Sequence, residues 1–186
     1  KKKKITTGSQ NVAVGSASGL ALTTGDQNVI VGEQAGEGLT TASAVTLVGC
    51  EAGGGATITG DHNVGVGRKA LFDLTTGASN VAVGRSALEN VTTADNNTAV
   101  GKDALKTNTT GHSNVAVGSL ALDANTTANN NVAVGKSALS ANTTGYGNVS
   151  MGKNALIANT TGYHNTSIGA DSMETNTEGH SNVAVG

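Results

Sequence analysis

Apolar and polar residues alternate over short stretches that recur along the whole chain at a fixed interval. The recurring stretch reads Asn-Val-Ala-Val-Gly, and its closing glycine returns eleven times between Gly15 and Gly186, at intervals of 17 residues with one exception of 18. Alternation with a period of two is typical of a β-strand, whose successive side chains point to opposite faces. We therefore predict one short strand per repeat, with Val132 and Val134 on the core face and Ala133 on the opposite face.

The remaining residues of each repeat predict turns. Thr-Thr-Gly followed by two polar residues is typical of a turn, in which Gly145 is expected to supply a positive φ. The Ser-Ala-Leu segment is too short to separate a second strand from a single helical turn. A unit of this length cannot hold the two helices of a helical repeat, so the pattern predicts an all-β protein, a parallel β-solenoid (β-roll) of about eleven 17-residue coils.

An asparagine precedes the first valine in ten of the eleven copies, and Val45 is the exception. Identical amides that are stacked on one another can hydrogen-bond along the axis of a rod. We interpret this column as a structural ladder. Its members are Asn11, Asn28, Asn63, Asn80, Asn97, Asn114, Asn131, Asn148, Asn165 and Asn182.

The first three coils place glycine where later coils place leucine or methionine. These glycines are Gly19, Gly36 and Gly53, and the first two are followed three residues later by Leu22 and Leu39, where most later coils have asparagine. A close-packed interior refills volume that is lost at one site from another site. Both positions are therefore expected to face the core.

The middle residue of the strand is never charged, although a solvated strand face usually carries polar side chains. An apolar stripe that runs along a rod favours contact with another copy of the chain, as in a cyclic homo-oligomer. The alternatives are a monomer that exposes the stripe and a coil whose second layer covers it. The candidate inter-chain stripe is Ala82, Ala99, Ala116 and Ala133.

Composition narrows the class of protein. The chain has 186 residues with 27 glycines, no proline and three aromatic rings, so a broad globular core is not expected. Apart from Lys1 to Lys4 the net charge is 7 − 13 = −6, which argues against nucleic acid as a partner. No apolar run approaches the ~20 residues of a membrane helix, so no membrane insertion is expected in this segment.

The domain organisation follows from the repeat. Residues 1–4 are interpreted as a basic leader or an expression tag, and residues 5–186 as a single β-solenoid repeat domain. The chain does not begin with Met and stops inside a motif, which we interpret as a fragment of a longer array. Cys50 is the single cysteine and cannot form a disulfide within the chain.

Three stretches resemble known fibrous proteins. The segments Ser113–Gly118 (SNVAVG) and Asn165–Gly169 (NTSIG) resemble the motif of trimeric autotransporter adhesin heads, although the adhesin repeat is shorter. The segment Ala138–Gly152 resembles repeats of phage and large-virus tail or surface fibre proteins. The resemblance implies a left-handed β-roll, a homotrimer, and an extracellular location on a virion fibre or cell surface. It also implies a structural segment that presents or contributes to attachment to a host surface.

The outermost turn carries rings in several nearby coils. His112, Tyr146, Tyr163 and His180 occupy one position of the repeat, with Asn129 between the first two. In coils that stack in register, neighbouring rings lie about 5 Å apart along the axis. They form a candidate stripe for stacking on sugar rings of a host glycan. The alternative is that the rings pack on one another or on a partner chain, since aromatic cross-strand pairs stabilise sheets.

Other polar columns give weaker signals. A basic column follows the closing glycine, and a solvated edge is the preferred interpretation, with binding of an anionic polysaccharide as the alternative. Its members are Arg68, Arg85, Lys102, Lys136 and Lys153. Asn-Thr-Thr triplets match the N-glycosylation pattern, although the repeat itself generates them as turn chemistry. They begin at Asn108, Asn125, Asn142 and Asn159.

Neither a catalytic motif nor a metal-ligand pattern emerges, so we expect no enzymatic activity, no cofactor and no metal. His164 and His180, like His62 beside Asp61, match no zinc spacing. Two alternatives to a structural fibre remain. One is an ice-binding solenoid, which the adjacent threonine pairs argue against because neighbouring side chains point in opposite directions. The other is a fibre-borne polysaccharide depolymerase with a site between chains.

Overall fold

The computed structural model describes residues 7–186, so Lys1 to Lys4 and the start of the predicted domain at Ile5 lie outside the described residues. Residues 7–186 form eleven strands of three residues each in one parallel sheet, and the strands follow one another in the order of the sequence. The strands are β1 (Val12–Val14), β2 (Val29–Val31), β3 (Thr46–Val48), β4 (Val64–Val66), β5 (Val81–Val83), β6 (Thr98–Val100), β7 (Val115–Val117), β8 (Val132–Val134), β9 (Val149–Met151), β10 (Thr166–Ile168) and β11 (Val183–Val185).

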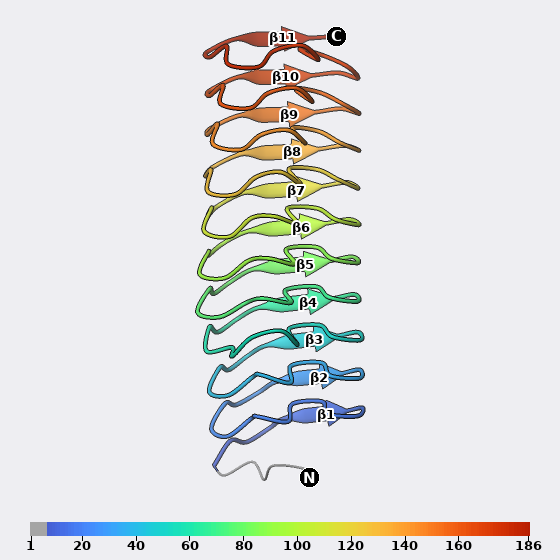
Figure 1. Cartoon of the computed structure of the whole chain (residues 1–186), viewed down its shortest axis with the longest axis vertical. Helices are drawn as coiled ribbons and strands as arrows, with labels where there is room; N and C mark the ends of the chain where they lie inside the picture. The colour runs from blue at the N-terminus through green and yellow to red at the C-terminus, as the bar shows by residue number, and fades with distance from the viewer. Residues whose placement is uncertain (1–6) are drawn as a thin grey trace.

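Every strand pairs with the same position of the next repeat. Val115 pairs with Val132, for example, and Val132 with Val149, so side chains of one position form a straight column along the molecule. The coils stack into a rod with β1 at one end and β11 at the other (Figure 1). At about 4.8 Å per strand, its ten intervals span roughly 48 Å. The prediction of a parallel all-β solenoid with one coil per repeat is confirmed.

The predicted orientation of the strands was wrong. The strand-centre column, formed by the middle residue of each strand, faces the interior. Val117 and Val134 instead keep 36% and 37% of their surface exposed, so they lie on the outside. The side chains expected to contact a partner chain are therefore enclosed within their own chain. Those with no exposed surface include Ala82, Ala99, Ala116 and Ala133.

The reason lies in how each coil closes over its own strand. After the strand, the chain folds back and places a leucine against the strand-centre column; a Cβ added at Gly65 would lie 3.2 Å from Leu71 Cδ1. The leucine fills most of the thin space between strand and turn, so only a small residue fits opposite it. Fully buried leucines at this position are Leu71, Leu88, Leu105, Leu122, Leu139 and Leu156.

The first coils reverse this division of volume. Where Gly53 replaces the leucine, a Cβ would lie 2.8 Å from Leu47 Cδ1, because the strand-centre residue is large instead. Ile30 has the same relation to Gly36 of its own coil, where a Cβ would lie 3.2 Å from Ile30 Cγ2, and Ile30 also reaches Gly19 of the preceding coil, where a Cβ would lie 3.0 Å from its Cδ1. Leu22 is also buried, with 1% of its surface exposed. The prediction that both exchange positions face the core is confirmed, and the strand centre supplies a third source of volume.

The connecting segment is neither a second strand nor a helical turn. It is a run of tight turns in which Ser137 and Leu139 have φ values of 56° and 54°. Left-handed backbone costs a non-glycine residue roughly 1 kcal/mol. In return it directs Leu139 into the core, where its N–H donates to Ala155 O at 3.0 Å.

Gly145 also differs from expectation. It is not among the residues with positive φ, and the left-handed residue of this turn is two positions later, as at Asn130 with φ 60°. Glycine is favoured because a Cβ at this position would collide with Gly162 O of the next coil. Ala128 at the same position of the preceding coil shows that a methyl group is tolerated where the coils adjust.

Candidate functional site

The asparagine ladder joins successive coils from inside the rod, with an interruption at Val45. Asn131 Nδ2 donates to Gly145 O at 2.9 Å, and Asn131 Oδ1 accepts from the backbone N–H of Asn148 at 2.9 Å and from its Nδ2 at 3.2 Å. The amide thus supplies the acceptor for the buried backbone N–H of Asn148, and it shares Gly145 O with Asn142 Nδ2. Its complete burial fits a structural role.

A second asparagine column lies parallel to the first and was missed in the sequence. Asn142 Nδ2 donates to Asn125 Oδ1 at 3.2 Å and to Gly145 O at 2.8 Å. This column occupies the position that holds leucine, isoleucine or valine in earlier coils. Its recurrence in five successive coils was the available signal, which the turn interpretation obscured. The members are Asn108, Asn125, Asn142, Asn159 and Asn176.

Burial removes the glycosylation signal of the Asn-Thr-Thr triplets. Asn108, Asn125, Asn142 and Asn159 have no exposed surface, and their Nδ2 atoms are used inside the rod. An acceptor amide must be accessible to receive a glycan. The folded coil therefore offers none at these four positions.

The outer turn is also tied together from coil to coil, first by side-chain oxygens. Asp61 Oδ1 accepts the backbone N–H of Ser43 at 2.7 Å, and Asn129 Oδ1 accepts that of His112 at 2.7 Å. At Asp26, the N–H of Ser9 donates to the carboxylate and lowers the pKa of Asp26. These carboxylates serve as acceptors in a ladder of their own.

Further along the same column the oxygen ladder changes into a ring stack. Tyr146 and Tyr163 lie parallel with centroids 5.1 Å apart, and Tyr163 and His180 with centroids 4.6 Å apart. His164 packs edge-on against both tyrosines, at 5.0 Å and 5.3 Å. We call these four residues the aromatic stack. His112 is not part of it, because the Asn129 coil separates it from Tyr146.

The stack covers both ring faces of Tyr163. The two faces of Tyr163 are covered by Tyr146 and His180, whereas Tyr146 keeps 45% of its surface exposed. Gly147 makes room for the edge-on ring, since a Cβ there would lie 3.1 Å from His164 Nε2. Flat stacking of a sugar on Tyr163 is therefore blocked.

Each threonine pair divides its roles. The first hydroxyl donates to a backbone carbonyl of the next coil, as from Thr143 to Thr160 O at 3.1 Å. The second threonine, such as Thr144, is exposed. The surface therefore carries one exposed threonine column rather than the paired columns of a flat Thr-x-Thr face.

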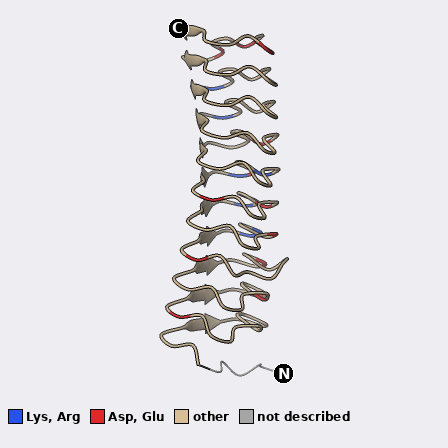
Figure 2. Ribbon diagram, turned by 90° about the vertical axis from the view of Figure 1, so that its left-hand side faces the viewer, with Lys and Arg blue, Asp and Glu red and all other residues tan. Residues whose placement is uncertain are grey.

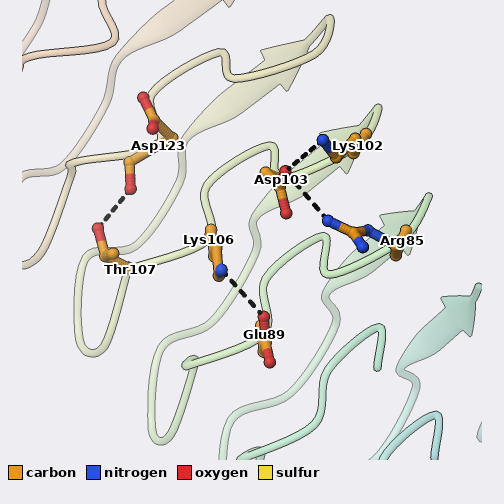
Figure 3. A network of polar contacts seen from close by, with 7 residues as sticks. All are labelled: Arg85, Glu89, Lys102, Asp103, Lys106, Thr107 and Asp123. Atoms are coloured by element: carbon orange, nitrogen blue, oxygen red, sulfur yellow. Dashed lines mark hydrogen bonds and ion pairs between the residues drawn. The ribbon is translucent and has the colours of Figure 1, made fainter. Parts of the chain in front are cut away.

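An ionic network occupies the turn that follows the strands in the middle of the rod (Figure 3). Asp103 Oδ2 lies 3.4 Å from Lys102 Nζ and 3.9 Å from an Arg85 nitrogen, and Lys106 Nζ lies 3.6 Å from Glu89 Oε2. Asp103 Oδ1 is buried without a hydrogen-bond partner. The alternation of charges from coil to coil offsets the repulsion of stacked like charges.

Two carboxylates beside this network have pKa values above the ordinary value. Burial, followed by the charge of Glu89, raises the pKa of Asp73. Burial is also the main cause that raises the pKa of Asp123, whose backbone carbonyl accepts the Thr107 hydroxyl. Both residues therefore ionise at some cost to the folded state.

The outward side of the sheet forms what we call the valine face, made by the first and third residues of every strand. It contains only valine, threonine, isoleucine and methionine. The third residues of β5 to β10 are exposed by 36% to 41%. Figure 2 shows the strands in tan along the whole rod, with acidic and basic residues confined to the turns. The result is a continuous, uncharged and mainly apolar strip.

Comparisons of the chain with protein-family models, curated proteins and solved structures found no match. Within residues 7–186 no helix is long and apolar enough to cross a membrane. The same part of the chain contains no group of three or more His, Cys, Asp or Glu side chains placed to hold a metal ion.

Proposed function

We propose that this chain is a structural fibre or adhesin segment, a stiff repeat shaft that presents or contributes to attachment to a host surface. The observation that carries the proposal is that several columns of hydrogen bonds run from coil to coil along the rod. Backbone pairs, two asparagine columns and a threonine column all hydrogen-bond from one coil to the next. Because each coil is held through several columns at once, bending must strain all of them together.

Self-association through the valine face is part of the proposal. Contiguous exposed apolar surface of this kind is typical of an interaction site. A strip ten strand spacings long and three residues wide covers roughly 500 Å². Stable interfaces bury about 800 Å² per partner, so the flanking columns must join the contact. A second copy of this rod has the matching length and the matching periodicity.

Charge favours parallel over antiparallel copies. The basic column follows the strands on one side of the valine face, and Asp61 and Asp95 precede β4 and β6 on the other. Parallel rods that face each other bring Asp61 level with Arg68, and Asp95 level with Lys102. Antiparallel rods would place the basic column against itself. At β2 both flanking residues are acidic, so this attraction is confined to the middle of the rod.

We propose a homotrimer with left-handed coils, located outside the cell on a virion fibre or cell surface. The support is the resemblance of the repeats to adhesin heads and viral fibres, together with the uncovered valine face. Three rods around one axis can each place this face inward, which a cyclic assembly does without leaving an open end.

Attachment to a glycan is assigned to the outer turn. Tyr146 and Tyr163 stack in one column, and each follows an exposed threonine, Thr144 or Thr161, by two residues. Tyrosine and threonine hydroxyls can exchange hydrogen bonds with the hydroxyl groups of a sugar. His112 lies outside the stack and is not required for this surface.

Deletion of one whole coil, residues 131–147, tests the shaft role. The expected product folds and is shorter by about 4.8 Å in small-angle X-ray scattering. A variant that lacks residues 131–139, half a coil, breaks the register and is the matched control. Equal loss of folding in both variants would contradict the proposal. A glycan array that compares the wild type with Tyr146→Phe tests attachment, and unchanged binding without the hydroxyl would remove that part.

A further inference from the structure

The only two tyrosines of the chain occupy equivalent positions of consecutive coils. Their rings are 4° from parallel with centroids 5.1 Å apart. Backbone hydrogen bonds fix the register on both sides, including His164 N–H to Tyr146 O at 3.0 Å and Ser181 N–H to Tyr163 O at 3.0 Å. The two phenols are therefore held face to face in the folded rod.

We propose that this pair is an oxidative cross-linking site, which joins consecutive coils through a dityrosine bond. The co-reactant is hydrogen peroxide with a haem peroxidase as the one-electron oxidant. Each phenol gives up one electron and its hydroxyl proton, and the two phenoxyl radicals join through their ortho carbons. The ortho hydrogens then move to the oxygens and restore both hydroxyls. Peroxide takes up the two electrons and two protons and leaves as two waters.

The surroundings suit this reaction. Tyr146 is 45% exposed, so an oxidant can reach the pair without unfolding the coil. Radical coupling within one chain gains from the fixed proximity of its two partners. His164 contacts both rings edge-on and holds them as neighbours. The biaryl product requires the rings to slide until their ortho edges meet, which the exposed position of Tyr146 permits.

The product would be a covalent staple along the rod axis. It closes a loop of one coil, and a cross-link of this kind stabilises chiefly by restricting the unfolded chain. This outcome is independent of glycan attachment and of oligomeric state. Under oxidising conditions it would hinder separation of the two coils that carry Tyr146 and Tyr163.

The test treats dilute protein with peroxide and a haem peroxidase. The expected result is dityrosine fluorescence together with loss of two hydrogen atoms from the mass of a single chain. After proteolysis, one cross-linked peptide should contain both tyrosines. Tyr163→Phe keeps the ring stack but must abolish the intrachain product.

A second control tests whether the bond requires tyrosines in consecutive coils or only two tyrosines in the chain. The double variant Asn129→Tyr with Tyr146→Phe keeps two tyrosines in the column but places them two coils apart. It should give no intrachain dityrosine. Formation of the bond at equal yield in this variant would overturn the proposal. So would cross-links found only between chains, or wild-type tyrosines that are hydroxylated or left unchanged.

Discussion

Replacing Asn131 by alanine tests how much the asparagine ladder contributes to stability. The side chain makes hydrogen bonds to Gly145 O, to the backbone N–H of Asn148, and to the amides of the coils before and after. Most of these partners keep another bond: Gly145 O still accepts from Asn142 Nδ2 at 2.8 Å, and Asn148 Nδ2 still donates to Gly162 O at 2.8 Å. The backbone N–H of Asn148 is the group that loses its acceptor.

The magnitude follows from that inventory. One buried donor left without a partner costs about 1 to 3 kcal/mol, and the lost bond to Gly145 O adds about 1 kcal/mol. We therefore expect Asn131→Ala to lower the free energy of unfolding by about 2 to 4 kcal/mol. The exposed Thr144→Ala, in the same coil, should change it by less than about 0.5 kcal/mol.

Equilibrium unfolding in urea measures both variants, and amide hydrogen exchange at Asn148 shows where the loss is located. Faster exchange at this amide, with protection retained in distant coils, is expected because each coil contacts only its neighbours. A destabilisation below about 1 kcal/mol, or unchanged exchange at Asn148, would refute the reasoning.

Three further predictions concern the core, the second asparagine column and pH. Ala116→Glu should unfold the central coils, as measured by circular dichroism, because it buries an unpaired charge. Val117→Glu should stay folded and should lose self-association, as measured by gel filtration. Equal folding of the two variants would contradict the assigned faces. Asn142→Leu should change stability by less than about 1.5 kcal/mol in urea, since earlier coils hold leucine there, and complete unfolding would be the opposing result. Asp123→Asn should raise the melting temperature slightly at pH 7, because the raised pKa of Asp123 means that its ionisation opposes folding. This gain should vanish as the pH falls below the ordinary value of 3.8, and a constant gain across the pH range would contradict it.

The repeat length predicted the architecture because a parallel in-register stack follows directly from identical coils. The position of Leu139 and the exchange of Gly19 for Leu22 also predicted core positions, since volume must be conserved in a packed interior. These inferences used only the spacing of the repeats and the size of the side chains. They therefore hold whichever face of the strand lies inside.

The orientation of the strands could not be obtained in the same way. Period-two alternation separates the faces of Val132 and Ala133 but does not say which is inside. The larger apolar side chain was assigned to the core, and this rule fails where Leu139 has already filled the space. That leucine reaches the core through a left-handed backbone, which few non-glycine residues adopt and which no propensity argument predicts.

The aromatic stack shows the same limit at the candidate site. Its column position could be predicted from the repeat, and packing of the rings on one another was an open alternative. Whether Tyr146 offers a face or an edge depends on the tilt of the rings and on the room that Gly147 gives to His164. Such details arise from side-chain packing between coils, which one repeat does not contain.

The central claim is that the valine face of this rod is covered by parallel copies of the same chain. Sedimentation equilibrium over a concentration series tests it most directly. The account predicts a species of three times the 18.2 kDa mass of one chain, which Val117→Glu converts to the single-chain mass without loss of β structure. A wild-type protein that stays at the single-chain mass at every concentration would contradict the account.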